Sequence, residues 1–366
     1  MGNKIVAEPD HPRVEQVLDS LMIAQREGCW PYGIAQQPHT EKNMPKTLKG
    51  MGQGKEKAEA RFFMAICFYM LGGVESDTAF IAVSLIFDLY PHIFLTDFAS
   101  LSNYERDCLQ GEIEKILTEA GINRRSREVA KQWVYNFTKL DRYWGGDPRN
   151  LFKGKPNFDV LCQRLMRGHK FREDSPNGFY GFREKMVAML AFFLMDRGLI
   201  PYYHLPVPVD FHVLRITTAC RLVKVEIIEY DDDVEETSMV NLYRAAYLGA
   251  IRKLTYEYCV EHDASALRLC DCFWLLSRTG CRRHPDNSSR RVGGHHGRKT
   301  VVAPIQYEWS EARVRSYRRT CGECPINKFC DQAVPARLYY DKGQLMARGD
   351  RSKPSQLGLF DTDRSF

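Results

Sequence analysis

The sequence predicts an all-α protein with more than one domain. Apolar residues recur at helical spacing along most of the 366 residues, whereas alternating, strand-like patterns are few. The length is sufficient for two compact domains, each with a core of its own. The longest apolar run, Met186 to Met195, is about half as long as a helix that crosses a bilayer. The first residues also lack the apolar segment of a secretory signal. We therefore expect a cytoplasmic protein without a membrane partner.

The expected helices begin after capping residues and end at turn residues. Ser102 and Glu105 form a capping box, and Gly121 ends the helix that the box begins. The segments with helical spacing are 14–23, 56–71, 77–89, 102–119, 126–138, 158–166, 182–195, 210–222, 234–260 and 265–276. Residues 336–366 are polar and lack any period, so we expect a flexible tail there.

The twelve cysteines divide into two groups. Six are scattered singly along the chain, several of them in apolar stretches, as reduced core thiols are. The others crowd between Cys270 and Cys330, which indicates a metal site in a reducing compartment. Within that group, Cys321, Cys324 and Cys330 are separated by two and by five residues, a spacing that can wrap one face of an inorganic cluster.

A fourth ligand is needed, and the sequence offers more than one. Cys281 closes the preceding expected helix and is the first choice, while Cys270 and Cys272 are alternatives. Zinc is the alternative metal, but zinc ribbons favour two C-x2-C units and the second unit is missing here.

A basic segment lies between the expected helices and the cysteine loop. Residues 282–319 contain ten Lys and Arg residues against three acidic residues, a net charge of +7 in a chain of net charge +6. Such a segment is either a solvated loop or a surface that contacts phosphates. We select four of its residues as candidate DNA contacts, namely Arg290, Arg291, Arg298 and Lys299.

The cysteine loop, placed after a helix that ends in cysteine, resembles the iron–sulfur loop of a known family. This family is the helix-hairpin-helix (HhH-GPD) DNA glycosylases, in the branch of endonuclease III and the adenine glycosylases. The resemblance implies a [4Fe–4S] cluster held by four cysteines, which here are Cys281, Cys321, Cys324 and Cys330. In the family only a few residues separate the first two ligands, whereas thirty-nine separate Cys281 from Cys321 here. The basic segment is therefore an insertion in this loop.

A second resemblance to the same family lies upstream of the cysteines. The stretch Val207-Pro-Val-Asp210-Phe-His212-Val-Leu-Arg215 resembles the family's V-D-T-H-V-x-R, with Phe211 in place of threonine. It implies that Asp210 is the catalytic aspartate, although a helix N-cap would explain the same position. The stretch Gly181-Phe-Arg183-Glu-Lys185 resembles the second half of the DNA-binding hairpin. It implies that Lys185 is the Schiff-base lysine and that Arg183 replaces a glycine.

Two further turns resemble the family's DNA contacts. Val74 stands where a glutamine fills the space left by the flipped base, and Ile122 stands at the position of the intercalating wedge. The resemblance covers residues 60 to 330. It implies a six-helix barrel domain with the hairpin at 61–204 and an iron–sulfur domain at 205–335, which residues 1–60 join. It also implies a monomer that binds double-stranded DNA.

The tail contains a short apolar motif. Gln356, Leu357, Leu359 and Phe360 belong to a Q-L-G-L-F stretch that resembles the peptide by which bacterial repair proteins bind the sliding clamp. Apolar anchors on a polar tether suit peptide-in-groove binding. Packing of these residues on the parent domain is the alternative.

The sequence thus predicts a DNA glycosylase of base excision repair, with AP-lyase activity if Lys185 attacks the sugar. Three alternatives stay open. The chain could be a non-catalytic iron–sulfur DNA-binding protein, a defence glycosylase that acts on hypermodified bases of viral DNA, or an N-glycoside hydrolase for RNA or small molecules.

Overall fold

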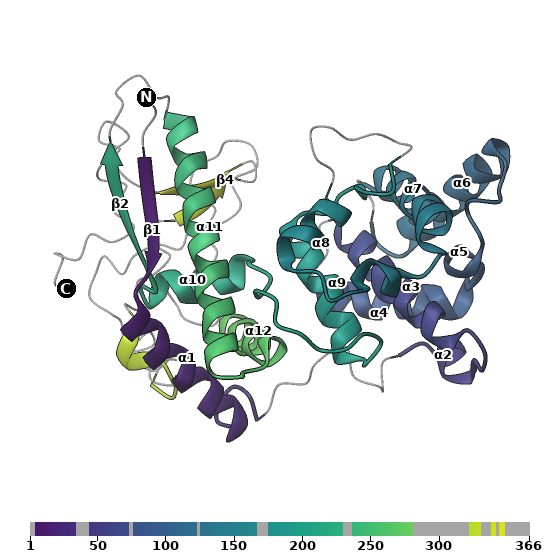
Figure 1. Cartoon of the computed structure of the whole chain (residues 1–366). Helices are drawn as coiled ribbons and strands as arrows, with labels where there is room; N and C mark the ends of the chain where they lie inside the picture. Colours follow the sequence, from purple (N-terminus) through teal and green to yellow (C-terminus); the bar gives the residue numbers. More distant parts are fainter. Residues whose placement is uncertain are drawn as a thin grey trace. The chain divides into compact units, whose positions relative to one another are not determined.

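The structure is a computed structural model of the chain. It describes residues 4–33, 44–72, 76–122, 125–166, 175–229, 236–280, 322–330, 338–341 and 344–347. The described residues are mostly helical, which confirms the expected fold class at that level (Figure 1). The chain forms two compact units, which are described separately below. Unit 1 combines Met1–Ala35 with Val209–Phe366, and unit 2 is Gln36–Pro208.

Unit 2 is built around one helix that is buried on all sides. This helix is α3 (Lys55–Met70), and every residue from Ala58 to Met70 is buried. A helix that is buried all round requires neighbours on every face. The other elements of the unit are α2 (Lys46–Gly50), α4 (Ser76–Leu89), α5 (His92–Leu95), α6 (Asn103–Glu119), α7 (Ser126–Trp144), η2 (Pro148–Phe152), α8 (Phe158–Leu165) and α9 (Glu184–Asp196). Of these, α4, α5, α7, α9 and η2 all contact α3.

The first boundary between the units differs from the expected one. The sequence interpretation assigned residues 1–60 to the unit formed by both chain ends. In the structure this boundary lies between Ala35 and Gln36. The reason is that α2 packs on α3 and α4, and that Ala58 and Ala60 already belong to the core of unit 2.

The core of unit 2 is rich in aromatic rings that meet edge to face. The ring centroids of Phe68 and Phe137 are 5.2 Å apart, as are those of Phe94 and Trp133. Such offset contacts add to the free energy gained by burying the rings. They fix α3, α5 and α7 against one another.

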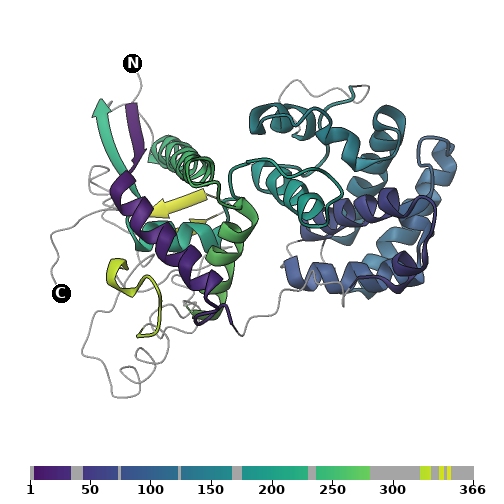
Figure 2. The same ribbon diagram turned by 60° about the horizontal axis from the view of Figure 1, so that its bottom comes forward.

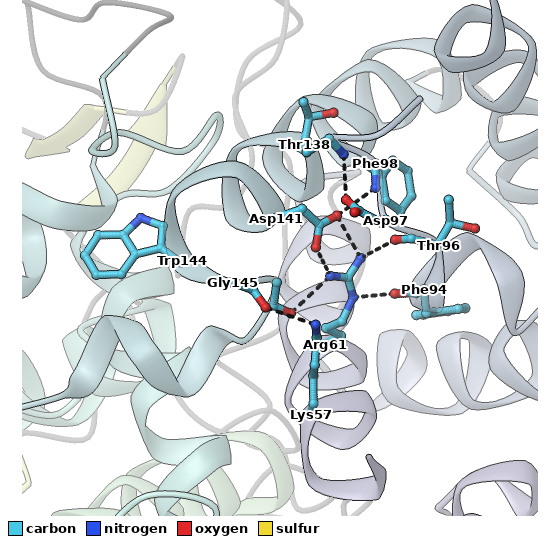
Figure 3. Close-up of polar contacts among 12 residues, drawn as sticks. Lys57, Arg61, Phe94, Thr96, Asp97, Phe98, Thr138, Asp141, Trp144 and Gly145 are labelled. Carbon is cyan, nitrogen blue, oxygen red and sulfur yellow. Dashed lines mark hydrogen bonds and ion pairs between the residues drawn. The ribbon is translucent and has the colours of Figure 1, made fainter. Parts of the chain in front are cut away.

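A buried ion pair crosses this core between α3 and α7 (Figure 3). The Nη1 atom of Arg61 donates to Oδ1 of Asp141 at 2.5 Å, and the two side chains are only 2% and 6% exposed. The same guanidinium donates to the carbonyl oxygens of Phe94 and Thr96, and also to that of Gly146. The remaining oxygen of Asp141 accepts from the Phe98 N–H at 2.8 Å. These contacts tie the loop after α5 and the turn after α7 to α3.

Unit 1 combines helices with a small sheet that the sequence interpretation did not expect. Strand β1 (Lys4–Pro9) pairs antiparallel with β2 (Val223–Glu229), Pro9 opposite Val223, and α11 packs on β1 (Figures 1 and 2). The helices are α1 (His11–Arg26), α10 (Phe211–Ala219), α11 (Glu236–Glu261) and α12 (Ala266–Leu275), with the π-helical turn η3 (Leu276–Gly280) and the 3-10 turn η6 (Asn327–Phe329). The strands were missed because their pairing joins segments over two hundred residues apart.

The C-terminal tail also contains regular structure. Strands β3 (Leu338–Asp341) and β4 (Gln344–Ala347) form an antiparallel hairpin within the segment that was expected to be a flexible tail. Since β4 contacts α11, packing on that helix accounts for strands that show no period of their own. Among the described residues, no helix combines the length and the apolar composition that a bilayer span requires.

Candidate functional site

The hairpin before α9 requires a glycine where the sequence predicted one. Gly181 has a φ of +77°, a region that favours glycine. A Cβ atom at this position would lie 2.3 Å from Cδ1 of Leu71. Arg183, in contrast, has a φ of −131° and a ψ of 172°, which any residue adopts. The replacement of the family's second glycine by Arg183 is therefore compatible with this backbone, and the exposed side chain stands directly before α9.

Three side chains of α7 hold the same hairpin by its backbone. The amide of Asn136, which is fully buried, accepts from the Tyr180 N–H at 2.7 Å and donates to the Tyr180 carbonyl at 3.1 Å. Lys139 donates to the carbonyl of Asn177 at 2.8 Å, and the indole of Trp144 donates to that of Pro176 at 3.0 Å. The sequence analysis missed these residues. Their only signal is that Asn136 and Lys139 interrupt the apolar face of a regular helix.

Lys185 lies in the first turn of α9, half-buried and close to the end of α3. Burial raises the pKa of the Cys67 thiol on α3 to about 12, and the positive charge of Lys185 acts on that thiol in the opposite direction. The Lys185 ammonium is thus within electrostatic reach of Cys67. Cys67 precedes Leu71 by one helical turn, so Lys185 and the Leu71–Gly181 contact share one end of α3.

The turn before α7 meets the same end of α3. Ile122 is 3% exposed, and a Cβ atom at Gly72 would lie 2.8 Å from its Cδ1 atom. The Ile122 side chain is therefore packed in the core of unit 2, and its role as an intercalating wedge stays a prediction. Val74, the other expected contact to the DNA stack, lies outside the described residues. Three predicted segments nevertheless come together, since Leu71, Gly72, Ile122, Gly181 and Lys185 all lie at the C-terminal end of α3.

Asp210 caps the N-terminus of α10 in unit 1. Its Oδ1 atom accepts from the backbone N–H groups of His212 at 2.8 Å and of Val213 at 3.1 Å. The carboxylate is half-buried. The positive end of the helix dipole favours a negative charge at this position. The N-cap role is thus confirmed, and it is compatible with chemistry because the cap fixes the orientation of the carboxylate.

A polar node links the helix that Asp210 caps to the turn before Cys281. The Nδ1 atom of His212 lies 3.0 Å from the hydroxyl of Ser277 in η3. The buried guanidinium of Arg215 donates to the carbonyl of Ser277 at 3.1 Å and to its hydroxyl at 3.2 Å. In the sequence, His212 and Arg215 stand out only as members of the stretch around Asp210. The structure shows that both bind the same serine.

The described part of the cysteine cluster fits a metal–thiolate loop. Cys324 and Cys330 are half-exposed at the ends of one short loop, and Ile326 between them is buried. Cys281 and Cys321 lie outside the described residues, and among the described residues no group of three metal-ligating side chains occurs. Cys272, one of the alternative ligands, is buried in unit 1, where its thiol lies 3.7 Å from the Leu21 carbonyl oxygen and burial raises its pKa to about 12.

Other expected sites cannot be placed. The basic segment 282–319, with Arg290, Arg291, Arg298 and Lys299, lies outside the described residues, as do Gln356, Leu357, Leu359 and Phe360 of the clamp-like peptide. Comparisons of the chain with models of protein families, with curated proteins and with solved structures find no match.

Proposed function

We propose that the chain is a DNA N-glycosylase of the helix-hairpin-helix type that removes a damaged or modified base from duplex DNA. The observation that carries the proposal is the meeting of three sequence segments at the C-terminal end of α3. These segments are the ones that the resemblance assigns to DNA contacts and to the Schiff-base lysine, and they are far apart in the chain. If the similarity of each motif arose by chance, these segments would not be expected to lie together in the fold.

The proposed chemistry begins with Asp210. Cleavage of the N-glycosidic bond leaves the bonding electron pair on the departing base and builds positive charge on the sugar. A carboxylate held in place by two backbone N–H groups can stabilise that charge without reorganising. The same carboxylate can accept a proton from the attacking water or amine. The target base has to leave the helical stack to reach these groups.

Lys185 provides the proposed alternative to water as nucleophile. Its neutral amine attacks C1′ of the sugar, the base leaves with the electron pair of the N-glycosidic bond, and the amine gives a proton to the carboxylate of Asp210. The C1′–O4′ bond then opens, O4′ takes up a proton, and the Schiff base that forms loses a proton from C2′. The 3′ phosphate then leaves with the electrons of the C3′–O bond, which cuts the strand. The half-buried position of Lys185 beside Cys67 and at the end of the hairpin supports this role.

The cofactor we propose is a [4Fe–4S] cluster held by Cys281, Cys321, Cys324 and Cys330. Such a cluster would supply a fixed shape for the cysteine loop and a local charge. The half-exposed thiols of Cys324 and Cys330 support it. We propose further that duplex DNA is bound by the hairpin at Gly181 and by the basic segment, and that the C-terminal peptide binds a sliding clamp.

Base release from a panel of damaged and modified duplexes tests this proposal. Asp210→Asn is the sharpest variant, because asparagine also caps helices and keeps the fold while it removes the charge. We expect base release to fall by about 10²-fold or more, as for the loss of a group that stabilises transition-state charge. Lys185→Gln should abolish strand cleavage without alkali, whereas Lys131→Gln, on the exposed side of α7, should change neither activity. Base release that is unchanged in Asp210→Asn would rule out the mechanism.

The same assay separates the alternatives. A wild-type protein that binds duplex DNA but releases no base from any duplex is a DNA-binding relative without catalysis. Release confined to hypermodified viral bases indicates a defence role. Strand cleavage that always requires alkali removes Lys185 from the mechanism and leaves Asp210 in it.

A further inference from the structure

The loop between Cys324 and Cys330 has little regular structure to hold it in place. Three backbone hydrogen bonds lie within it. The Asn327 N–H donates to the Cys324 carbonyl at 3.1 Å, the Phe329 N–H to the Ile326 carbonyl at 3.0 Å, and the Cys330 N–H to the Asn327 carbonyl at 3.2 Å. Ile326, which is 2% exposed, anchors the middle of the loop. These contacts are local to the loop, and a contact from a distant segment joins them.

Arg13 of α1 provides that contact. Its Nη2 atom donates to the carbonyl of Phe329 at 2.8 Å, across 316 residues of sequence. Its Nε atom donates to the carbonyl of Cys220, directly after α10, at 2.6 Å. Both contacts are partly buried, and hydrogen bonds from a charged donor are stronger than neutral ones. The fork of one guanidinium therefore joins α1, the end of α10 and the residue that precedes Cys330.

The position of Arg13 is itself fixed at the start of α1. The Asp10 N–H donates to the carbonyl of Leu222 at 2.9 Å, and the carboxylate of Asp10 pairs with Lys224 at 3.0 Å. The start of the helix is thus attached to the same turn after α10 that receives the Nε atom of Arg13. The backbone of α1 at Asp10 and the Nε atom of Arg13 are thus both attached to the turn after α10, which limits where the guanidinium can lie.

We propose that Arg13 is a positioning residue for the cysteine loop, one that holds the backbone of Cys330 where its thiolate binds the metal centre. The inference rests on the proposed cofactor, but not on the proposed glycosylase activity. Mutation of a group that orients a metal ligand typically lowers metal affinity about 10–100-fold. A guanidinium is suited to this task because its rigid fork presents several donors at once, whereas a lysine ammonium is a point charge on a flexible stem. The positive charge of Arg13, bonded to the residue that precedes Cys330, would also offset negative charge on a bound cluster.

The test uses the full-length protein with its metal bound. Arg13→Ala removes both hydrogen bonds, and Arg13→Lys keeps the charge but not the fork. Arg26→Ala, at the exposed end of the same helix, is the matched control. The measurements are bound iron and acid-labile sulfide, the rate of iron release to a chelator, the reduction potential, and amide exchange at Asn327–Phe329.

We expect Arg13→Ala to release iron roughly tenfold to a hundredfold faster than the wild type, in the range found for residues that orient metal ligands. Its reduction potential should fall because a positive charge is lost, and amide exchange in η6 should speed up. Arg13→Lys should recover most of the potential but only part of the retention. Arg26→Ala should match the wild type in every measurement. This split between charge and geometry is not expected of a residue that only stabilises the fold.

Two results would overturn the proposal, and they differ in what else they refute. Wild-type protein without bound metal refutes the cofactor and this role together. Iron-loaded Arg13→Ala with the release rate and potential of the wild type refutes the role of Arg13 alone. If Arg13→Ala does not fold, Arg13→Lys with wild-type release and exchange gives the same refutation. A protein that carries the cluster and shows these effects, but releases no base from DNA, leaves the role of Arg13 supported and the glycosylase refuted.

Discussion

The carboxylate of Asp141 faces the buried guanidinium of Arg61, so its removal should destabilise unit 2 strongly. In Asp141→Ala the guanidinium loses its 2.5 Å partner while it stays 2% exposed and bonded to backbone carbonyls. The Phe98 N–H loses its acceptor as well. Removal of one member of a buried ion pair costs about 3–5 kcal/mol, because an uncompensated charge remains. Figure 3 shows that the carbonyls of Phe94 and Thr96 also accept hydrogen bonds from the guanidinium, and these neutral partners do not compensate its charge.

Thermal unfolding of the full chain, followed by circular dichroism, measures this loss. For a unit of this size each kcal/mol lowers Tm by roughly 2–4 °C, so the expected drop is about 6–20 °C. Amide exchange of Phe98 should accelerate in parallel, because its N–H donates to the deleted carboxylate. The two readouts together locate the loss in unit 2.

Two variants make the result decisive. Glu128→Ala breaks an exposed pair with Arg125 on the same helix, where the side chains are about half exposed, and should cost about 0–1 kcal/mol. Arg61→Met added to Asp141→Ala should recover part of the loss, because no buried charge is then left unpaired. A drop in Tm for Asp141→Ala no larger than that for Glu128→Ala would refute the reasoning.

Three further predictions concern the hairpin and a helix cap. Gly181→Ala should lower Tm and weaken duplex binding at least severalfold, because φ is positive and the new methyl group meets Leu71; a wild-type Tm and affinity would contradict this. Asn136→Ala should cost about 2–4 kcal/mol, since both hydrogen bonds to the Tyr180 backbone are lost in a buried setting; amide exchange at Tyr180 checks it, and unchanged exchange would count against it. Ser102→Ala should cost about 1 kcal/mol by loss of the capping box, measured as a small drop in Tm; a loss above about 2 kcal/mol would mean that the hydroxyl has another role.

The sequence predicted the helices well because their signals are local. The capping box at Ser102 and Glu105 is present, with hydrogen bonds in both directions, and α6 ends at Glu119 as expected. Apolar spacing of 3.6 residues reflects which face of a helix is buried, so the helix can be predicted without knowing which elements pack against it. The pairing of β1 with β2 carries no such local signal, because the hydrogen-bonding partners of each strand lie on the other strand, over two hundred residues away.

The candidate site was predictable where the backbone itself demands a residue type. Gly181 has a positive φ and no room for a side chain, and Asp210 begins a helix. Ile122 shows the limit of this reasoning, since its position in a motif indicates a residue that meets DNA but does not indicate that its side chain is buried against Gly72. The direction of a side chain at a turn depends on what the turn packs against.

The cysteine loop shows most clearly what the sequence predicts by itself and what depends on the tertiary structure. The spacing of Cys321, Cys324 and Cys330 predicted a metal loop, because the geometry of a cluster limits how far apart its ligands stand in a short loop. That Arg13 holds this loop, and that Ser277 receives both His212 and Arg215, was decided by tertiary structure alone. A hydrogen bond between residues hundreds of positions apart produces no regular spacing in the sequence, because it depends on where two distant segments lie once the core has formed.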